Sequence, residues 1–93
     1  MAQSPNATEM PPVEVIVSEV VASLTFVAHA YLEPPAAASG ESVPADLEAA
    51  DIALDIAGRA FERIQPRFQP EERSALARSL TDLRLAYVKK RGL

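Results

Sequence analysis

The sequence contains no cysteine and no tryptophan, and aromatic residues make up only 5% of its 93 residues. Without cysteine the chain can form no disulfide, no thiolate metal site and no cysteine nucleophile. Small secreted domains commonly depend on disulfides, so we expect a reducing, cytoplasmic setting. Because aromatic rings are few, the core must be built mainly from Ala, Val and Leu side chains.

Basic residues are absent from residues 1–58, which contain nine acidic residues. Residues 59–93 contain all nine Lys and Arg residues and only four acidic ones. One interpretation is a basic half that binds nucleic acid or an acidic partner. We favour the other interpretation, in which the two halves pack together and their charges offset each other.

Histidine occurs once, at His29, and the three glycines are scattered along the chain. A single His without Cys has no partner for a metal site or a catalytic triad, and scattered glycines do not make a phosphate-binding loop. Glu48, Asp51 and Asp55 share one helix face and could bind a divalent cation. Arg59 follows Asp55 by four residues, however, which favours a surface ion pair. We therefore expect His29 at the surface, and no catalytic, cofactor or metal site.

The longest apolar segment is residues 13–32, which carries only two acidic residues and no Lys or Arg. Its length would allow a membrane span. Glu14, Glu19 and His29 interrupt it, no basic residue flanks it, and we expect no membrane contact. The valine-rich residues 13–17 leave a β-strand open as a minor alternative.

Apolar residues recur at intervals of three and four in three segments bracketed by proline, which predicts helices over about 12–33, 44–65 and 70–91. Residues 1–10 are polar and aperiodic, and we expect a disordered tail there, followed by one helical domain over 11–93. Three segments with short connections predict an all-α three-helix bundle. The predicted core stripes are Val13, Val17, Val20, Leu24, Val27 and Tyr31 in the first helix, widened by Ile16, Val21 and Ala28; Leu47, Ala50, Leu54, Ala57, Phe61 and Ile64 in the second; and Leu76, Leu80, Leu83 and Tyr87 in the third.

The first helix also carries Val15, Phe26 and Leu32 on its otherwise polar half. These additional apolar side chains would suit self-association. We therefore expect a homodimer, and Val15, Phe26 and Leu32 are its candidate subunit contacts. Gly58, in the second helix, is a candidate point of close helix approach.

Several stretches of the chain are similar to sequence motifs of a family of short bacterial proteins. They are Gln69-Pro70-Glu71-Glu72, the run LTDLRLAYV over 80–88, DLEAA over 46–50, and Ser23-Leu24 with 28–32. Together they resemble the domain of unknown function 1844 family, over roughly residues 16–90. The chain differs from the family's motifs at two positions, Glu33 after Leu32 and Gln69 before Pro70. Both lie at helix ends, so the predicted apolar core positions are unchanged.

The resemblance implies a small, all-helical, cytoplasmic bacterial protein, and it implies no activity and no catalytic residues. Asp82 and Arg84 of the matched run point to different sides of a helix because they are two residues apart. Tyr87 lies on the predicted stripe, where its hydroxyl needs a partner. We expect Asp82, Arg84 and Tyr87 to form a polar contact between helices that sets their packing.

Lys89, Lys90 and Arg91 form a short basic run at the end of the third helix. The helix dipole favours cations there, although a basic patch for phosphate is an alternative. The favoured function is a non-enzymatic protein–protein interaction or scaffold module. The alternative is RNA-associated or ribosome-associated binding through the basic C-terminal half.

Overall fold

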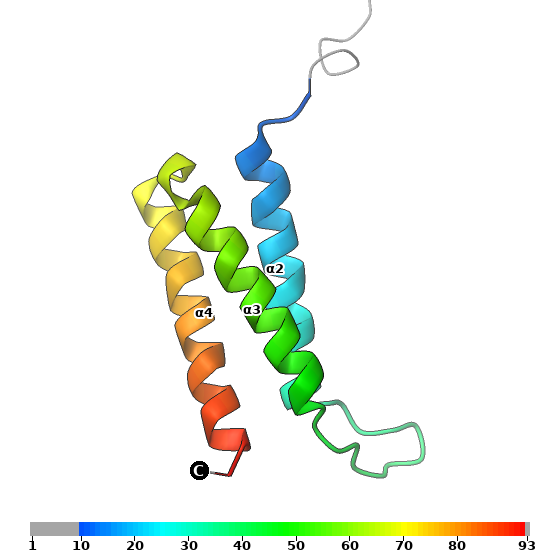
Figure 1. The fold of residues 1–93 in the computed structure, drawn as a ribbon. Coiled ribbons are helices and arrows are strands. Elements are labelled where there is room, and N and C mark those ends of the chain that lie inside the picture. Colours follow the sequence, from blue (N-terminus) through cyan, green and yellow to red (C-terminus); the bar gives the residue numbers. More distant parts are fainter. Residues whose placement is uncertain (1–9, 93) are drawn as a thin grey trace, which may run out of the picture.

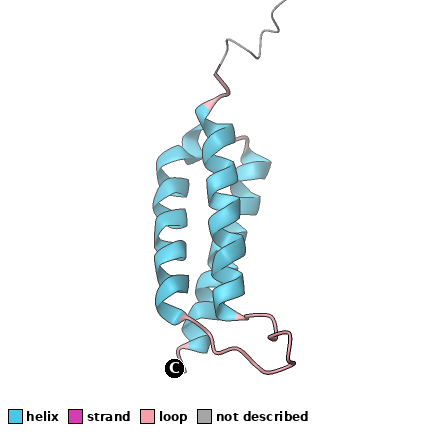
Figure 2. Ribbon diagram, turned by 90° about the vertical axis from the view of Figure 1, so that its right-hand side faces the viewer, coloured by secondary structure: helices cyan, strands magenta, loops and turns pink. Residues whose placement is uncertain are grey.

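Residues 10–92 are described by the structure, a computed structural model, and they form three α-helices and one short 3-10 helix (Figures 1 and 2). Helix α2 spans Val13–Leu32, α3 spans Leu47–Ile64, η1 spans Gln65–Arg67 and α4 spans Pro70–Lys90. No strand occurs within this part of the chain. The prediction of an all-helical bundle is confirmed. The expected disordered tail falls outside the described residues, apart from Met10.

Helix α2 begins directly after Pro12, whose carbonyl oxygen accepts hydrogen bonds from the amides of Val15 and Ile16. Proline suits this position because the first amides of a helix have no partner within the helix. The strand alternative for residues 13–17 is therefore wrong. Helix α2 ends as predicted before Pro34 and Pro35, and a loop with a turn at Gly40 leads to α3.

Helix α3 begins three residues later than the sequence predicted. Asp46 provides the reason, because its side chain accepts a hydrogen bond from the Ala49 amide at 3.0 Å and so caps the helix. The Asp46 amide donates to the carbonyl of Tyr31 at 2.9 Å, which ties the start of α3 to the end of α2. Pro44 therefore lies in the loop, outside the helix.

Helix α4 begins at Pro70 and ends one residue short of the predicted Arg91. Gly92 follows the helix with a φ of 82°, in the left-handed region where glycine carries no Cβ penalty. The amide of Gly92 donates to the carbonyl of Lys89 at 3.1 Å, which closes the last turn. The sequence-based assignment of Gly92 to the helix end is confirmed.

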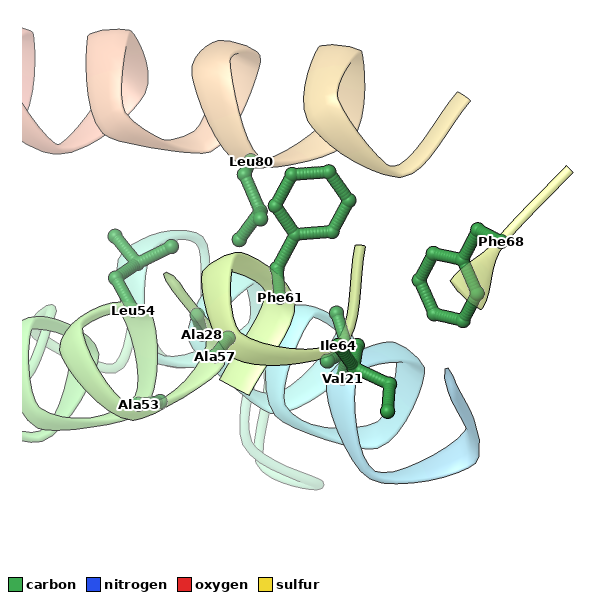
Figure 3. Close-up of a cluster of buried hydrophobic side chains, with 9 residues drawn as sticks. All are labelled: Val21, Ala28, Ala53, Leu54, Ala57, Phe61, Ile64, Phe68 and Leu80. Atoms are coloured by element: carbon green, nitrogen blue, oxygen red, sulfur yellow. The ribbon is translucent and has the colours of Figure 1, made fainter. Parts of the chain in front are cut away.

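Helices α2 and α3 run antiparallel and pack along their lengths, while α4 lies against both of them (Figures 1 and 2). The buried side chains at the centre come from all three helices and from Phe68, and Figure 3 shows them meeting. Leu80 reaches from α4 toward Leu54 and Phe61 of α3, and the Phe61 and Phe68 ring centroids are 6.2 Å apart. Most core positions on α2 and α3 are valine or alanine, which allows the two helices to approach closely. The buried core consists of Val21, Ala28, Ala53, Leu54, Ala57, Phe61, Ile64, Phe68 and Leu80.

The predicted stripe of α3 is confirmed, since all its residues except the half-buried Leu47 are buried. The predicted stripe of α2 is only partly correct. The buried residues of α2 are Val21 and Ala28, which were predicted at the edge of the core face, and Leu32, which was predicted on the polar half. The buried side is therefore centred roughly a quarter of a turn from the predicted centre. Val13, Val20 and Tyr31 are 47%, 45% and 40% exposed. Helix α2 thus has a wider apolar arc than α3 and α4 cover.

Candidate interaction surface

Six large apolar side chains on α2 and α3 remain exposed on the side of the bundle away from α4, and we call this surface the open face. Their exposed fractions run from 40% to 53%. At these fractions they expose on the order of 500 Å² of surface, as large as the biggest apolar patch of a typical monomeric protein. The open face consists of Val13, Ile16, Val20 and Tyr31 of α2 and Ile52 and Ile56 of α3.

Two hollows lie between α2 and α3 along the open face, one toward each end. The hollow near the start of α2 has a volume of about 490 Å³ and is lined by residues that include Val13, Val17 and Arg63. The hollow near the end of α2 has a volume of about 280 Å³, and Tyr31 and Ile56 are among its lining residues. No residue of α4 lines either hollow, and their walls are mainly Val, Ile, Leu and Ala. Such concave apolar surfaces suit protruding apolar side chains.

Two charged residues of opposite sign lie beside the open face near the start of α2, Glu19 next to Ile16 on α2 and Arg63 in the hollow between α2 and α3. On α3 the acid Glu48 also precedes Ile52 by four residues. Glu19 follows Ile16 by three residues and lies on the border formed by α2, away from α3. Arg63 lies on α3 seven residues after Ile56, and it lines the hollow near the start of α2. None of the ion pairs between described residues includes Glu19 or Arg63.

The ion pairs between described residues all join a base of residues 59–93 to an acid of residues 1–58. Arg67 Nε lies 2.9 Å from Glu14 Oε1, and Lys90 Nζ lies 3.4 Å from Glu33 Oε2. Arg59 Nε lies 3.1 Å from Asp55 Oδ2, at the spacing of four that the sequence predicted. The halves of opposite charge therefore pack together. The pairs at Glu14 and Glu33 attach both ends of α2 to the rest of the bundle.

The three candidate subunit contacts are in two different environments. Val15 and Phe26 are 45% and 74% exposed, on the side of α2 that faces away from the core. Leu32 is only 1% exposed. The expectation that Leu32 lies on an outer face is wrong, because Leu32 lies on the same buried side of α2 as Val21 and Ala28. The sequence missed the open face, because we assigned its α2 residues to the core.

Among the described residues no side-chain hydrogen bond or salt bridge includes Asp82, Arg84 or Tyr87, so their polar contact stays a prediction. Asp82 lines a shallow hollow between α4 and α2 together with Thr25 and His29. Arg84 instead extends over Gly58 of α3, where an added Cβ would meet its guanidinium. Asp82 and Arg84 diverge because α4 turns about 100° per residue. Arg84 and Tyr87 are three residues apart and lie near each other on the helix, but Arg84 extends to Gly58 while Tyr87 packs against the core.

Tyr87 packs against the core, and the guanidinium carbon of Arg91 lies 5.6 Å from the centre of its ring. This distance suits a cation–π interaction. Lys90 is paired with Glu33, while Lys89 is exposed at the end of the helix. The basic run Lys89, Lys90 and Arg91 is thus partly engaged within the molecule.

His29 is exposed on α2, as expected from its position on the polar half of the helix. Glu48, Asp51 and Asp55 are exposed on α3, and Asp55 pairs with Arg59. Within residues 10–92 no group of three or more His, Asp and Glu side chains is arranged to hold a metal ion.

Helix α2 is long and apolar enough to cross a membrane by length and composition alone. A mostly buried core helix and a signal sequence satisfy the same test, and 17% of the apolar window of α2 is buried in the bundle. In this structure Val21, Ala28 and Leu32 are buried inside the bundle, and salt bridges attach both ends of the helix. A membrane-spanning α2 would have to leave α3 and expose that core.

Comparisons with known proteins do not identify the chain. No family model, curated protein or solved structure matches it. The resemblance to the domain of unknown function 1844 family therefore stays a prediction, and the open face is the feature of the structure that bears on function.

Proposed function

We propose that the protein is a non-enzymatic interaction module that binds another protein through the open face. The main support for this proposal is the six large apolar side chains, each 40% to 53% exposed, on one side of α2 and α3. Contiguous apolar patches of this size commonly mark binding surfaces. The walls of the two hollows are mainly aliphatic, with Arg63 and Arg67 in the hollow near the start of α2, which suits apolar side chains of a partner.

The proposal includes a cytoplasmic bacterial setting, in agreement with the family resemblance and with the absence of cysteine from the sequence. A scaffold of this kind needs a rigid face rather than a moving one. Rigidity is supported by the salt bridges at both ends of α2 and by the hydrogen bond from the Asp46 amide to the Tyr31 carbonyl. A preorganised face loses less conformational entropy on binding.

Binding of RNA or of ribosomes through the basic C-terminal half is the alternative proposal. It would require the bases of residues 59–93 to converge on one accessible surface. The salt bridges of Arg59, Arg67 and Lys90 direct three of them toward acids of the other half instead. This arrangement of charges favours a protein–protein interaction module over an RNA-binding or ribosome-binding protein.

Affinity capture from an extract of the source cells, followed by mass spectrometry, tests the function. Wild-type protein is compared with Ile52→Asp, on the open face, and with Phe26→Asp, a matched control on the other side of α2. We expect Ile52→Asp to lose proteins that the wild type and Phe26→Asp retain, with and without ribonuclease. Equal capture by Ile52→Asp, or complete loss after ribonuclease together with salt-dependent RNA binding, would contradict the proposal.

A further inference from the structure

We propose that the open face binds a second copy of this chain, so that α2 and α3 of two copies enclose a shared four-helix core. This inference rests on the proposed function and names the partner. It also relocates the dimer contact from the side of Val15 and Phe26 to the side of Ile52 and Ile56. The open face contains residues of both α2 and α3, whereas Phe26 lines a hollow between α2 and α4 together with Thr25, His29 and Asp82.

The size of the open face fits a pair of copies. Its six side chains expose on the order of 500 Å² per copy, so two copies would bury about 1,000 Å², the lower bound for a specific interface. The partly exposed neighbours Leu24, Val27 and Ala60 would add to that area. A two-fold interface must also be self-complementary, and this face combines protruding isoleucines with two apolar hollows.

The charges of Glu19 and Arg63 bear on how the two copies pair. When the two-fold axis runs parallel to the helices, α2 of each copy lies over α3 of the other at the same level. Arg63 is level with the first turns of α2, because it lines one hollow with Val13 and Val17. Glu19 lies half a turn beyond Val17, so it would meet Arg63 of the second copy, and symmetry makes this contact twice. The opposite charges of Glu19 and Arg63 favour this pairing.

Light scattering during gel filtration of the full chain measures the mass directly. We expect about twice the monomer mass of 10.0 kDa at tens of micromolar protein, with dissociation on dilution. Ile56→Asp should weaken dimerisation by about 100-fold, because it places a charge at the centre of the interface. Phe26→Asp, the matched control, should remain dimeric. Circular dichroism confirms that each variant keeps its helices.

Exchanging the charges of Glu19 and Arg63 provides a second test of the dimer, which applies even if Ile56→Asp does not fold. Glu19→Arg and Arg63→Glu should each weaken the dimer by about tenfold, because each places like charges together across the interface. The double variant Glu19→Arg/Arg63→Glu should restore it. Failure of the double variant to restore dimerisation would overturn the proposed pairing.

Other results would overturn the inference. A monomer at 100 µM, whether or not it binds lipid vesicles of neutral or anionic composition, excludes the second copy as the occupant. A dimer that Phe26→Asp dissociates and Ile56→Asp does not would place the contact on the other side of α2. If the chain is monomeric but Ile52→Asp still loses captured proteins, the inference fails while the proposed function stands.

Discussion

The Nε of Arg67, in η1, donates a hydrogen bond to the Oε1 of Glu14, in the first turn of α2, at 2.9 Å. The two residues are 53 positions apart in the sequence, so this contact joins the end of α3 to the start of α2. The Glu14 side chain is 29% exposed and that of Arg67 is 60% exposed, which leaves the pair accessible to salt. Hydrogen bonds from the backbone amide of Glu14 and from Arg67 hold the pKa of the Glu14 carboxyl below its ordinary value.

This pKa shift predicts an acid dependence of stability. Because the folded-state pKa of Glu14 is lowered, its stabilising contribution is present above the unfolded-state pKa and is lost as the pH falls through the folded-state pKa. We expect Glu14→Gln to reduce stability at pH 7 and to flatten the loss of stability below about pH 4.3, the ordinary pKa of a Glu carboxyl. Urea unfolding at several pH values measures both. An identical acid dependence in wild type and Glu14→Gln would contradict the prediction.

Gly58→Ala should stabilise the protein by about 0.5–1 kcal/mol, because alanine is a better helix former at this position in the middle of α3. The only atoms near the new Cβ belong to the Arg84 guanidinium, the end of a flexible and exposed side chain that can move aside. Thermal and urea unfolding measure the change, and Arg84→Ala/Gly58→Ala serves as the control. A loss of stability that the double variant removes would show instead that the Arg84 position above Gly58 is required.

Leu80→Ala should destabilise the bundle by about 2–4 kcal/mol, because it removes buried methyl groups and leaves a cavity. Leu80 is 4% exposed and is the buried residue through which α4 contacts Leu54 and Phe61 (Figure 3). Leu85, on the same helix, is 59% exposed, so Leu85→Ala should change stability by less than about 0.5 kcal/mol. Chemical unfolding of the two variants provides the comparison, and equal losses would place α4 in a different register.

Asp46→Ala should cost about 1 kcal/mol, because the Ala49 amide at the start of α3 would lose its side-chain acceptor. Asp46→Asn keeps an oxygen at the capping position, so it should recover most of the lost stability. Urea unfolding of the two variants tests this, and hydrogen exchange of the Ala49 amide shows whether the effect is local. Equal losses in Asp46→Ala and Asp46→Asn would mean that the charge, rather than the cap, is important.

The helices were predictable because their signals are local. Proline at the ends, apolar spacing of three and four, and glycine at position 92 depend only on nearby residues and on backbone geometry. The largest boundary shift, at the start of α3, came from choosing Pro44 as the first residue, whereas the Asp46 side chain caps the helix. The Asp55–Arg59 pair was equally local and was predicted from its spacing.

The candidate site was less predictable, because it depends on which part of α2 the other helices cover. Val13, Val20 and Tyr31 have the same apolar character as Val21 and Ala28, so composition cannot distinguish exposed residues from buried ones. Leu32 was assigned to the outer half and is buried. An unusually wide apolar arc was the available signal, and it indicated a second partner for α2 without showing where that partner binds.

The sequence by itself determined three helices, their approximate ends, the core face of α3 and the separation of charge between the two halves. The tertiary structure alone decided the rotation of α2 about its axis, the extension of Arg84 over Gly58, and the joining of the two halves by Glu14–Arg67 and Glu33–Lys90. Hydrogen bonding within a helix depends on neighbours four residues apart, which the sequence contains directly. The rotation of a helix depends on how side chains from distant segments fill the same volume, and only the packed structure determines that.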